Sequence, residues 1–349
     1  MKKLFIIAMI VTMIVAALPG IALAAGDIEV TPVTFPVTLS DQQNYTIAGY
    51  LYTRQGNPND ESQCGKRSRT VQVLLSGATY NHTYWDAPAV NGVDYSYARF
   101  MAGQCYSVLA LDRLGTGASS RPDGNFITKV TEADAIAQVL SSLRTNHNPA
   151  GRRFKRIVLV SHSFGSFLSV YTLGEYGNVA DALVVTGWLH SPDIPRLDSG
   201  YVTGLLTNPA FASYITVDPP VRSLLFYHAP AADPMVIAQD NATMNDTLPR
   251  GFFLDGIGVF TARAYGDVGQ IKALTKVDQV NVPVFVQLGD NDALFPSAVA
   301  GAEASFYSSA PLVTVDNLTN IGHGFNLHTN HLAGWQNIEG WILNNVVNN

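Results

Sequence analysis

The sequence predicts an α/β fold in which a mostly parallel sheet carries helices on both faces. Ile157-Val-Leu-Val160 is a short apolar run rich in β-branched residues, typical of a strand buried on both faces. The segment that begins at Ser166 can continue as a helix packed on that sheet. Similar apolar runs recur along the chain, at 71–75, 106–111, 182–188, 282–288 and 312–315. Buried strands that alternate with helices are typical of this class.

The amino terminus has the layout of a secretory signal peptide. Lys2 and Lys3 precede an apolar run from Leu4 to Leu18, which Pro19-Gly20 breaks before Ala22-Leu-Ala24. An uncleaved membrane anchor is the alternative, but the break and the small-x-small pattern favour cleavage after Ala24. We therefore exclude residues 1–24 from the fold. We expect a secreted or periplasmic protein with no stable membrane insertion after cleavage.

Composition sets the scale of the folded part. About 325 residues remain after the signal peptide, enough for one large α/β domain with an insertion. The chain is 47% hydrophobic and 14% charged, so it can bury a large core. Its formal net charge is -6, or -8 without Lys2 and Lys3, and its basic residues form only short loop segments. We expect a small-molecule substrate and no nucleic-acid partner.

The first third of the chain predicts the edge of the sheet. Residues 28–54 alternate and are rich in Val, Thr, Ile and Tyr, which predicts an antiparallel hairpin. The strand at 71–75 then runs into Ser76-Gly77-Ala78. Thr131 to Thr145 has one apolar face and a Thr-x-x-Asp start, which predicts an amphipathic helix that begins with a capping box.

The turn after Val160 is the most informative stretch. Ser161, Ser163 and Gly165 place small residues two before and two after a central serine, as a nucleophile elbow requires. At these residues the chain resembles the α/β-hydrolase family, although Ser161 stands where the usual G-x-S-x-G motif has its first glycine. The resemblance implies that Ser163 is the nucleophile and that the fold is an α/β-hydrolase fold.

Two further loops strengthen the resemblance. Ser76-Gly77-Ala78 occupies the place of the family's His-Gly-x turn, so the N–H groups of Ala78 and Phe164 would form the oxyanion hole. The loop from Asp112 to Ser119 resembles the D-x-R-G-x-G-x-S loop after the fourth strand. Its Gly115-x-Gly117 lacks the third glycine of a dinucleotide fingerprint. We expect no metal and no cofactor.

The second half of the chain supplies the other two members of a triad. Gly289-Asp290-Asn291-Asp292 resembles the family's turn that carries the acid, which makes Asp292 the carboxylate and Asp290 a helper or bystander. Asp193 is the second choice, since some members place the acid there. Asn320-Ile-Gly-His323 resembles the loop of the catalytic histidine. The order Ser163, Asp292, His323 is that of α/β hydrolases. We expect His328 and His331 to be surface or structural residues.

A long segment without regular alternation lies between the two halves. In the family a cap is inserted here, so we expect a hydrolase core at 25–189 and 282–349 and a cap (lid) at 190–281. Seven apolar side chains of the cap would turn inward over Ser163, or alternatively form only the cap's own core: Phe211, Tyr214, Leu224, Phe226, Tyr227, Phe252 and Phe253. We expect His82, Tyr84 and Trp85 to line the substrate pocket.

Cys64 and Cys105 are the two cysteines of the chain. In an exported protein such a pair is expected to form a disulfide. Each precedes a predicted strand, at 71 and 106. The resemblance implies that these strands are parallel neighbours, which would bring both cysteines to the non-catalytic edge of the sheet.

Together these features predict a secreted serine hydrolase of the carboxylesterase or lactonase type. It would cleave a small to medium hydrophobic ester or lactone through an acyl-enzyme intermediate. Within enzymes, a peptidase that releases N-terminal residues and a cofactor-free perhydrolase are the alternatives. A non-catalytic binding module of the same fold is a further alternative, which an intact Ser-Asp-His set disfavours.

Overall fold

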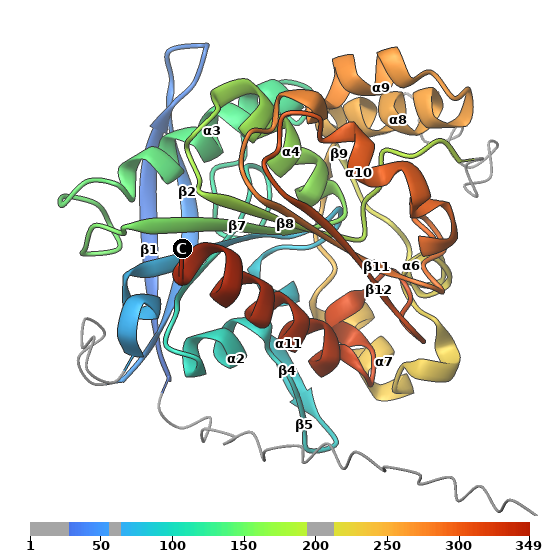
Figure 1. Ribbon diagram of the computed structural model, residues 1–349, viewed down its shortest axis with the longest axis horizontal. Coiled ribbons are helices and arrows are strands. Elements are labelled where there is room, and N and C mark those ends of the chain that lie inside the picture. The colour runs from blue at the N-terminus through green and yellow to red at the C-terminus, as the bar shows by residue number, and fades with distance from the viewer. Residues whose placement is uncertain (1–27, 56–63, 194–212) are drawn as a thin grey trace, which may run out of the picture.

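The computed structural model describes residues 28–55, 64–193 and 213–349 (Figure 1). The predicted signal peptide lies outside these ranges. None of the helices within them is long and apolar enough to cross a membrane.

One mixed sheet organises these residues, with the strand order β1-β2-β6-β3-β7-β8-β11-β12. Strand β2 pairs antiparallel with β1 and with β6, and every other neighbouring pair is parallel. The expected edge hairpin and the mostly parallel sheet are therefore confirmed. The bounds of the strands are β1 Ile28–Thr38, β2 Asn44–Arg54, β3 Thr70–Leu75, β6 Ser107–Leu111, β7 Arg156–His162, β8 Ala182–Thr186, β11 Val284–Gly289 and β12 Val313–Leu318.

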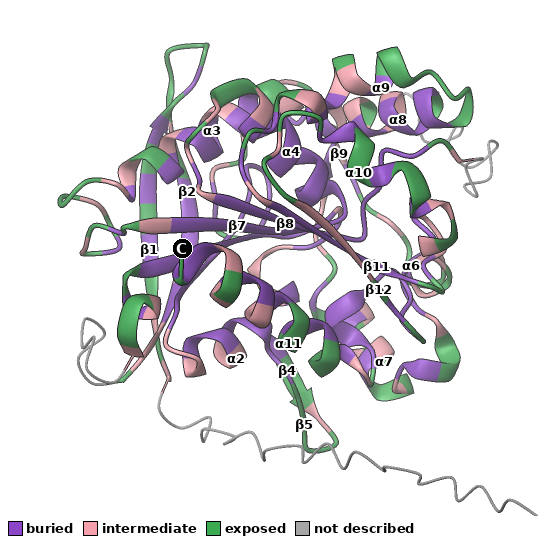
Figure 2. Cartoon of the chain, in the orientation of Figure 1, coloured by how far each residue is buried: buried purple, intermediate pink, exposed green. Residues whose placement is uncertain are grey.

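Helices cover both faces of the sheet (Figure 1). Successive residues of a strand point to opposite faces, so Ile157 and Leu159 of β7 join the core cluster under α3 and α4. Val158 and Val160 join the cluster shared with α2 and α11. Figure 2 shows the central strands buried along their length. The bounds of these helices are α2 Tyr97–Gly103, α3 Lys129–Ser142, α4 Phe164–Tyr176 and α11 His331–Ile342.

Helix α3 begins two residues before the predicted start. Thr128 is its N-cap, and the capping box pairs Thr128 with Thr131. The expected box of Thr131 and Asp134 is wrong, because Thr131 is the third helical residue and its hydroxyl accepts from the backbone N–H of Thr128 at 2.8 Å. The sequence offers two threonines three residues apart, and the first of them starts the helix.

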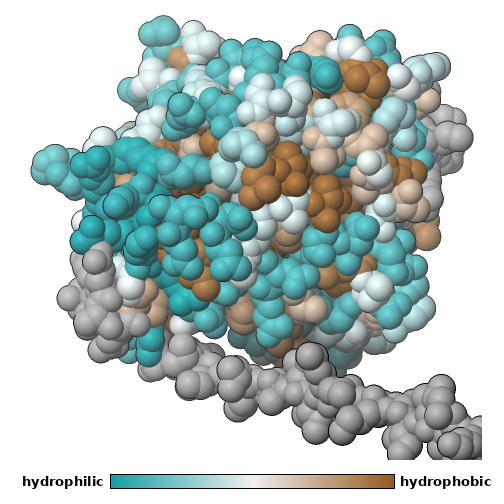
Figure 3. All heavy atoms as spheres, in the orientation of Figure 1, coloured by the Kyte–Doolittle hydropathy of each residue, from teal (hydrophilic) through white to brown (hydrophobic). Residues whose placement is uncertain are grey.

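The segment predicted as a cap contributes short elements at the end toward which the parallel strands point (Figure 1). The last two helices of this segment pack on the core, α8 on α3 and α9 on α4. The end of the cap at residue 281 stays a prediction. Figure 3 shows the surface in the orientation of Figure 1. Apolar side chains lie mainly on its right-hand half, whereas the left-hand half is hydrophilic. The bounds are β9 Tyr214–Ile215, α6 Pro219–Phe226, α7 Pro234–Thr243, β10 Leu248–Pro249, α8 Arg250–Ala264 and α9 Val268–Thr275.

Short elements complete the described chain. Strands β4 and β5 form a hairpin between β3 and α2, and α10 lies between β11 and β12. Their bounds, with those of the 3₁₀ turns and of the terminal π-helical turn, are β4 Ala87–Val90, β5 Val93–Tyr95, α10 Glu303–Phe306, η2 Gly65–Arg69, η3 His82–Tyr84, η4 Ala229–Ala231, η5 Val277–Gln279, η6 Ser297–Ala302, η7 Phe325–Leu327 and η8 Leu343–Val347.

A disulfide joins Cys64 and Cys105, whose Cα atoms are 5.5 Å apart. Strands β3 and β6 are parallel neighbours, and each cysteine lies shortly before the start of one of them. The expected bridge at the amino-terminal edge of the parallel strands is confirmed.

Candidate active site

Ser163 lies in a strained turn between β7 and α4. Its backbone has φ 55° and ψ -123°, a conformation that residues with a side chain rarely adopt. Its carbonyl oxygen accepts from the N–H groups of Ser166 at 2.8 Å and Phe167 at 3.1 Å, so the helix begins at once. Because the peptide bond is trans, the N–H of Phe164 points opposite to that carbonyl, out of the helix end.

Small residues on both sides of Ser163 make this turn possible. A Cβ on Gly165 would lie 2.4 Å from the backbone oxygen of Leu75, so a side chain there would collide with β3. Ser161 fits because its side chain points into the sheet, where Oγ donates to the carbonyl of Val184 at 3.0 Å. The departure from the family's first glycine therefore leaves no polar group unsatisfied.

A hydrogen-bonded chain connects Ser163 to two residues that are distant in the sequence. Nε2 of His323 lies 2.8 Å from Oγ of Ser163, and Nδ1 lies 2.9 Å from Oδ2 of Asp292. The other oxygen of Asp292 accepts from the N–H groups of Leu294 at 2.8 Å and Phe295 at 2.9 Å. The side chains of Ser163, Asp292 and His323 are all buried. A carboxylate held in this way keeps the Nδ1 proton on the imidazole and leaves Nε2 free to accept from a hydroxyl.

The other carboxylates considered for this role lie elsewhere. Asp290 is exposed, and its neighbour Asn291 donates to it. Asp193 is half-buried. Of the three acids, Asp292 is the partner of His323.

The loop after β3 lies directly beside Ser163. A Cβ on Gly77 would be 2.9 Å from Cβ of Ser163, so glycine permits the close approach. The buried Arg113 donates from Nε to the carbonyl of Ser76 at 3.2 Å and from Nη2 to that of Gly77 at 3.1 Å. Because Arg113 holds the Gly77 carbonyl, the N–H of Ala78, in the same trans peptide, points away from the guanidinium.

The family model described as "Alpha/beta hydrolase family" matches residues 72–332, which is most of the chain. The chain belongs to the α/β hydrolase family. This confirms both the resemblance and the fold class expected from the sequence. A search of curated proteins gives no match.

Solved structures with the same fold include enzymes that act on different bonds. The esterase from Thermogutta terrifontis (malate bound) aligns with a TM-score of 0.57 and 16% identity, covering 89% of this chain and 98% of that one. The Paleococcus ferrophilus monoacylglycerol lipase aligns with 0.56 and 14% identity over 79% and 94%. The epoxide hydrolase CorEH aligns with 0.54 and 14% identity over 90% and 99%. At these identities the likeness concerns the fold alone.

In this α/β hydrolase the loop after Ala78 is tied to α6 and α7. Thr79 has φ 62°, and both its hydroxyl and its carbonyl accept from Nη1 of Arg222. Nη2 of Arg222 lies 2.7 Å from Asp240, and both of these side chains are fully buried. Tyr80 and Tyr227 also donate to Asp240, at 3.0 and 2.8 Å. The segment predicted as a cap thus holds the backbone at Thr79, two residues after Gly77, which lies beside Ser163.

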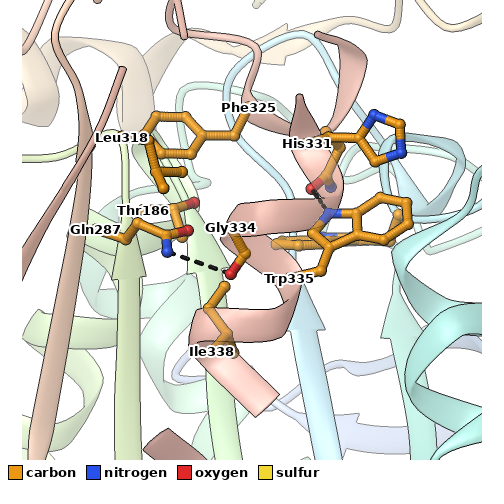
Figure 4. Close-up of a pocket in the computed structure, with 10 residues that line it drawn as sticks. Thr186, Gln287, Leu318, Phe325, His331, Gly334, Trp335 and Ile338 are labelled. Atoms are coloured by element: carbon orange, nitrogen blue, oxygen red, sulfur yellow. Dashed lines mark hydrogen bonds between the residues drawn. The ribbon is translucent and has the colours of Figure 1, made fainter. Parts of the chain in front are cut away.

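The three residues expected to line the pocket lie in packed surroundings. Tyr84 is fully buried with its ring stacked on His162, and burial raises the pKa of its hydroxyl well above 10. Trp85 lines a cavity of about 10 Å³, which has room for at most one water. Figure 4 shows this cavity beside Gly334, Trp335 and Ile338 of α11. His82 stacks on Tyr50 with its Nδ1 2.7 Å from Asp112. These are packing and hydrogen-bonding contacts, and a role of the three residues in lining a substrate pocket stays a prediction.

Aromatic side chains from the predicted cap pack against Phe164 and His323. Phe226 lies with its ring centroid 5.5 Å from that of His323, and Phe253 stacks on Phe164 at 6.4 Å. Phe252 contacts Phe164 edge to face at 5.6 Å. Leu224, by contrast, is 75% exposed and does not turn inward. Phe211 lies outside the described residues.

His328 is buried near the site, whereas the sequence predicted only that it is a surface or structural residue. Its Nδ1 lies 2.9 Å from the carbonyl of Gly324, and its Nε2 accepts from the N–H groups of Gly322 and His228, both at 3.0 Å. Burial lowers its pKa from 6.5 to about 4. The sequence does show a second histidine five residues after His323. That its ring bonds the backbone beside His323 depends on the fold and could not be predicted from this spacing.

His162 packs beside His323 with ring centroids 4.8 Å apart. Burial, and then the charge of His323, holds its pKa well below 6.5, so it stays neutral beside the site. Within the part of the chain that the structure describes, no group of three or more His, Cys, Asp and Glu side chains is placed to hold a metal ion.

Proposed function

We propose that this α/β hydrolase is an exported serine hydrolase that cleaves small to medium hydrophobic esters or lactones through an acyl-enzyme. The observation that carries the proposal is the hydrogen-bonded chain from Asp292 through His323 to Ser163, with spacings of 2.9 and 2.8 Å. The strained elbow at Ser163 further supports it, because strain of this kind concentrates at functional sites.

The first half-reaction forms the acyl-enzyme. Oγ of Ser163 attacks the carbonyl carbon of the substrate while Nε2 of His323 takes the hydroxyl proton. Asp292 keeps the imidazole oriented and stabilises its charged form. The N–H groups of Ala78 and Phe164 would accept the negative charge that develops on the carbonyl oxygen. The bond to the leaving alcohol then breaks, and His323 returns the proton to that oxygen.

The second half-reaction releases the acid. His323 removes a proton from a water molecule, which attacks the acyl carbon and forms the second tetrahedral intermediate. The bond to Oγ breaks, Ser163 recovers its proton from His323, and a carboxylic acid leaves. Every proton that moves is carried by His323, and the water molecule is the second reactant besides the ester or lactone.

Two observations support the proposed substrate class and location. Phe226, Phe252 and Phe253 place apolar rings around Phe164 and His323, as expected of a pocket for a hydrophobic acyl or alcohol group. The Cys64–Cys105 disulfide is typical of an oxidising compartment, in agreement with the predicted signal peptide.

Labelling with a fluorophosphonate probe tests the proposed chemistry. The wild-type protein should form a covalent adduct on Ser163, and Ser163→Ala should form none. Ser163→Ala should also lower kcat on the order of 10⁴-fold or more while the fold survives. Ser161→Ala is the matched control, and it should keep labelling because its hydroxyl bonds only the Val184 carbonyl. An unlabelled wild type would favour a non-catalytic binding module.

A panel of substrates tests the proposed specificity. We expect hydrolysis of short and medium-chain p-nitrophenyl esters or of lactones, and little release from solid polyester film, because an enclosed apolar pocket excludes a polymer chain. Faster turnover of aminoacyl anilides would favour a peptidase. Halogenation driven by peroxide and a short carboxylic acid would favour a perhydrolase.

A further inference from the structure

The backbone on both sides of His323 is held by a single side chain. The carbonyl of Gly324, one residue after His323, accepts from Nδ1 of His328 at 2.9 Å. The N–H of Gly322, one residue before, donates to Nε2 of the same ring at 3.0 Å. The imidazole of His328 therefore spans the turn whose central residue touches Ser163.

The same ring connects this turn to the predicted cap. Its Nε2 also accepts from the N–H of His228 at 3.0 Å, and the N–H of Gly324 donates to the carbonyl of Phe226 at 2.6 Å. A Cβ on Gly322 would lie 2.5 Å from the backbone nitrogen of His228 and 2.9 Å from Nε2 of His328. The approach is so close that only glycine fits, and a small displacement of the ring would move the turn.

These partners determine the form of the imidazole. A carbonyl only accepts, so Nδ1 carries the proton, and two N–H groups require a lone pair on Nε2. Protonation of Nε2 would set a third N–H against two donors. The titratable groups around the ring are His228, Asp292, His323 and Tyr227, of which His228 and His323 disfavour its charged form and Asp292 favours it.

We propose that His328 is a positioning residue for the hydrolysis: in its neutral, Nδ1-protonated form it fixes Gly322 and Gly324 and thereby holds Nε2 of His323 on Ser163. This inference rests on the proposed function, because its effect is on the step in which His323 takes the serine proton. The imidazole of His328 does not touch the reacting atoms. It acts through the turn, so its removal should lower kcat and leave KM nearly unchanged.

Three substitutions separate the contacts of the ring. His328→Leu removes the hydrogen bonds of both ring nitrogens. In His328→Gln the side-chain oxygen can reach the place of Nε2 and accept from Gly322 and His228, whereas in His328→Asn the amide nitrogen can reach the place of Nδ1 and donate to Gly324. His331→Gln is the matched control: His331 is also buried, but its ring bonds the backbone of His328, at 2.6 Å, and of Asp94 rather than that of Gly322 or Gly324.

The experiment measures kcat and KM for p-nitrophenyl butyrate, the rate of fluorophosphonate labelling and Tm for each variant. We expect His328→Leu to lower kcat and the labelling rate on the order of 10²-fold, the effect of a misplacement of about 1 Å. His328→Gln should recover at least about 10-fold of that loss, and His331→Gln should lower Tm while it keeps the wild-type labelling rate.

Two outcomes would overturn the inference and spare the proposed function. One is that the wild type is labelled by the probe and all His328 variants are labelled at the wild-type rate. The other is a loss of kcat in His331→Gln as large as that in His328→Asn, which would make any buried histidine here equivalent. If His328→Leu does not fold, the comparison of His328→Gln and His328→Asn with His331→Gln still decides, because only the two His328 variants should slow labelling. A wild type that does not label would remove the proposed function, and the inference with it.

Discussion

The carboxylate of Asp292 accepts three hydrogen bonds, two from backbone N–H groups and one from His323. Asp292→Asn would place an amide opposite Nδ1, and the imidazole would take the tautomer with its proton on Nε2, facing Ser163. We expect kcat for a p-nitrophenyl ester to fall on the order of 10⁴-fold with the fold intact. Asp290→Asn is the control, and because Asp290 is exposed it should stay near wild type. Equal losses in the two variants would contradict the assignment.

At the residue scale the sequence could indicate the three side chains that the structure joins by hydrogen bonds, but it gave no sign of the residues that hold the backbone around them. Ser163, Asp292 and His323 were recognisable because each follows a buried strand, and parallel strands bring such residues to one edge. Arg113 and His328 act through backbone groups of segments that only the fold brings near. No local pattern shows that Arg113 reaches the carbonyls of Ser76 and Gly77.

The loop from Ser76 to Ala78 depends on an ion pair from two other elements. Arg113, in the loop after β6, donates to both carbonyls and also lies 2.7 Å from Glu132 of α3, where both side chains are buried. Arg113→Met should release the loop and lower kcat about 10²-fold, the effect of losing one oxyanion-hole donor. It should also destabilise the fold, because an unpaired carboxylate stays buried.

The double variant Arg113→Met/Glu132→Gln distinguishes the two effects. Without a buried charge it should recover most of the lost Tm, yet its kcat should stay low because the loop is still free. Glu132→Gln alone should keep kcat within a few-fold of wild type, since Arg113 still reaches the loop. Full recovery of kcat in the double variant would show that the guanidinium does not orient the loop.

Helices and strands could be predicted where burial produces a clear apolar pattern in the sequence. Their ends and their buried faces were harder to predict where tertiary contacts determine them. The central strands are continuous apolar runs because both faces of a parallel sheet are covered. The start of α3 was missed by two residues because Thr128 and Thr131 can each act as a cap. Leu224 was expected to face inward but is exposed, since the apolar face of α6 depends on how that helix docks. Composition shows that the predicted cap is apolar, and packing determines which of its side chains reach Ser163.

Buried neutral histidines make the stability of the whole molecule depend on pH. Burial lowers the pKa of His162, His328 and His331, and that of His328 reaches about 4. Between a pH of about 6.5 and 4 the unfolded chain therefore binds protons that the native state does not, and the free energy of unfolding falls as the pH falls.

Urea unfolding at pH 7 and pH 5 tests the contribution of His328. The wild type should lose on the order of 2 kcal/mol more than His328→Gln over this interval, because the substituted side chain does not titrate. The groups around this ring, His228, Asp292, His323 and Tyr227, are common to both proteins, so their own titration largely cancels. Equal losses in the two proteins would mean that His328 does not titrate in this range in the unfolded chain.

The Cys64–Cys105 bridge and the proposed catalytic residues lie at opposite ends of the parallel strands. Both cysteines lie shortly before the starts of β3 and β6, whereas Ser163, Asp292 and His323 follow the ends of β7, β11 and β12. The bridge closes a loop with a sequence separation of 41, which in the chain-entropy model stabilises the fold by about 4 kcal/mol. For a chain of this size that corresponds to roughly 6 °C in Tm.

The double variant Cys64→Ser/Cys105→Ser should therefore lower Tm by roughly 6 °C and leave kcat for a p-nitrophenyl ester at 25 °C unchanged. Removing only one cysteine would leave a free thiol, so the double variant gives the cleaner comparison. Reduction of the wild type with dithiothreitol should reproduce the shift, and the reductant should have no effect on the double variant. A loss of kcat well below the Tm of the variant would show that the bridge also supports the loop at the far end of β3.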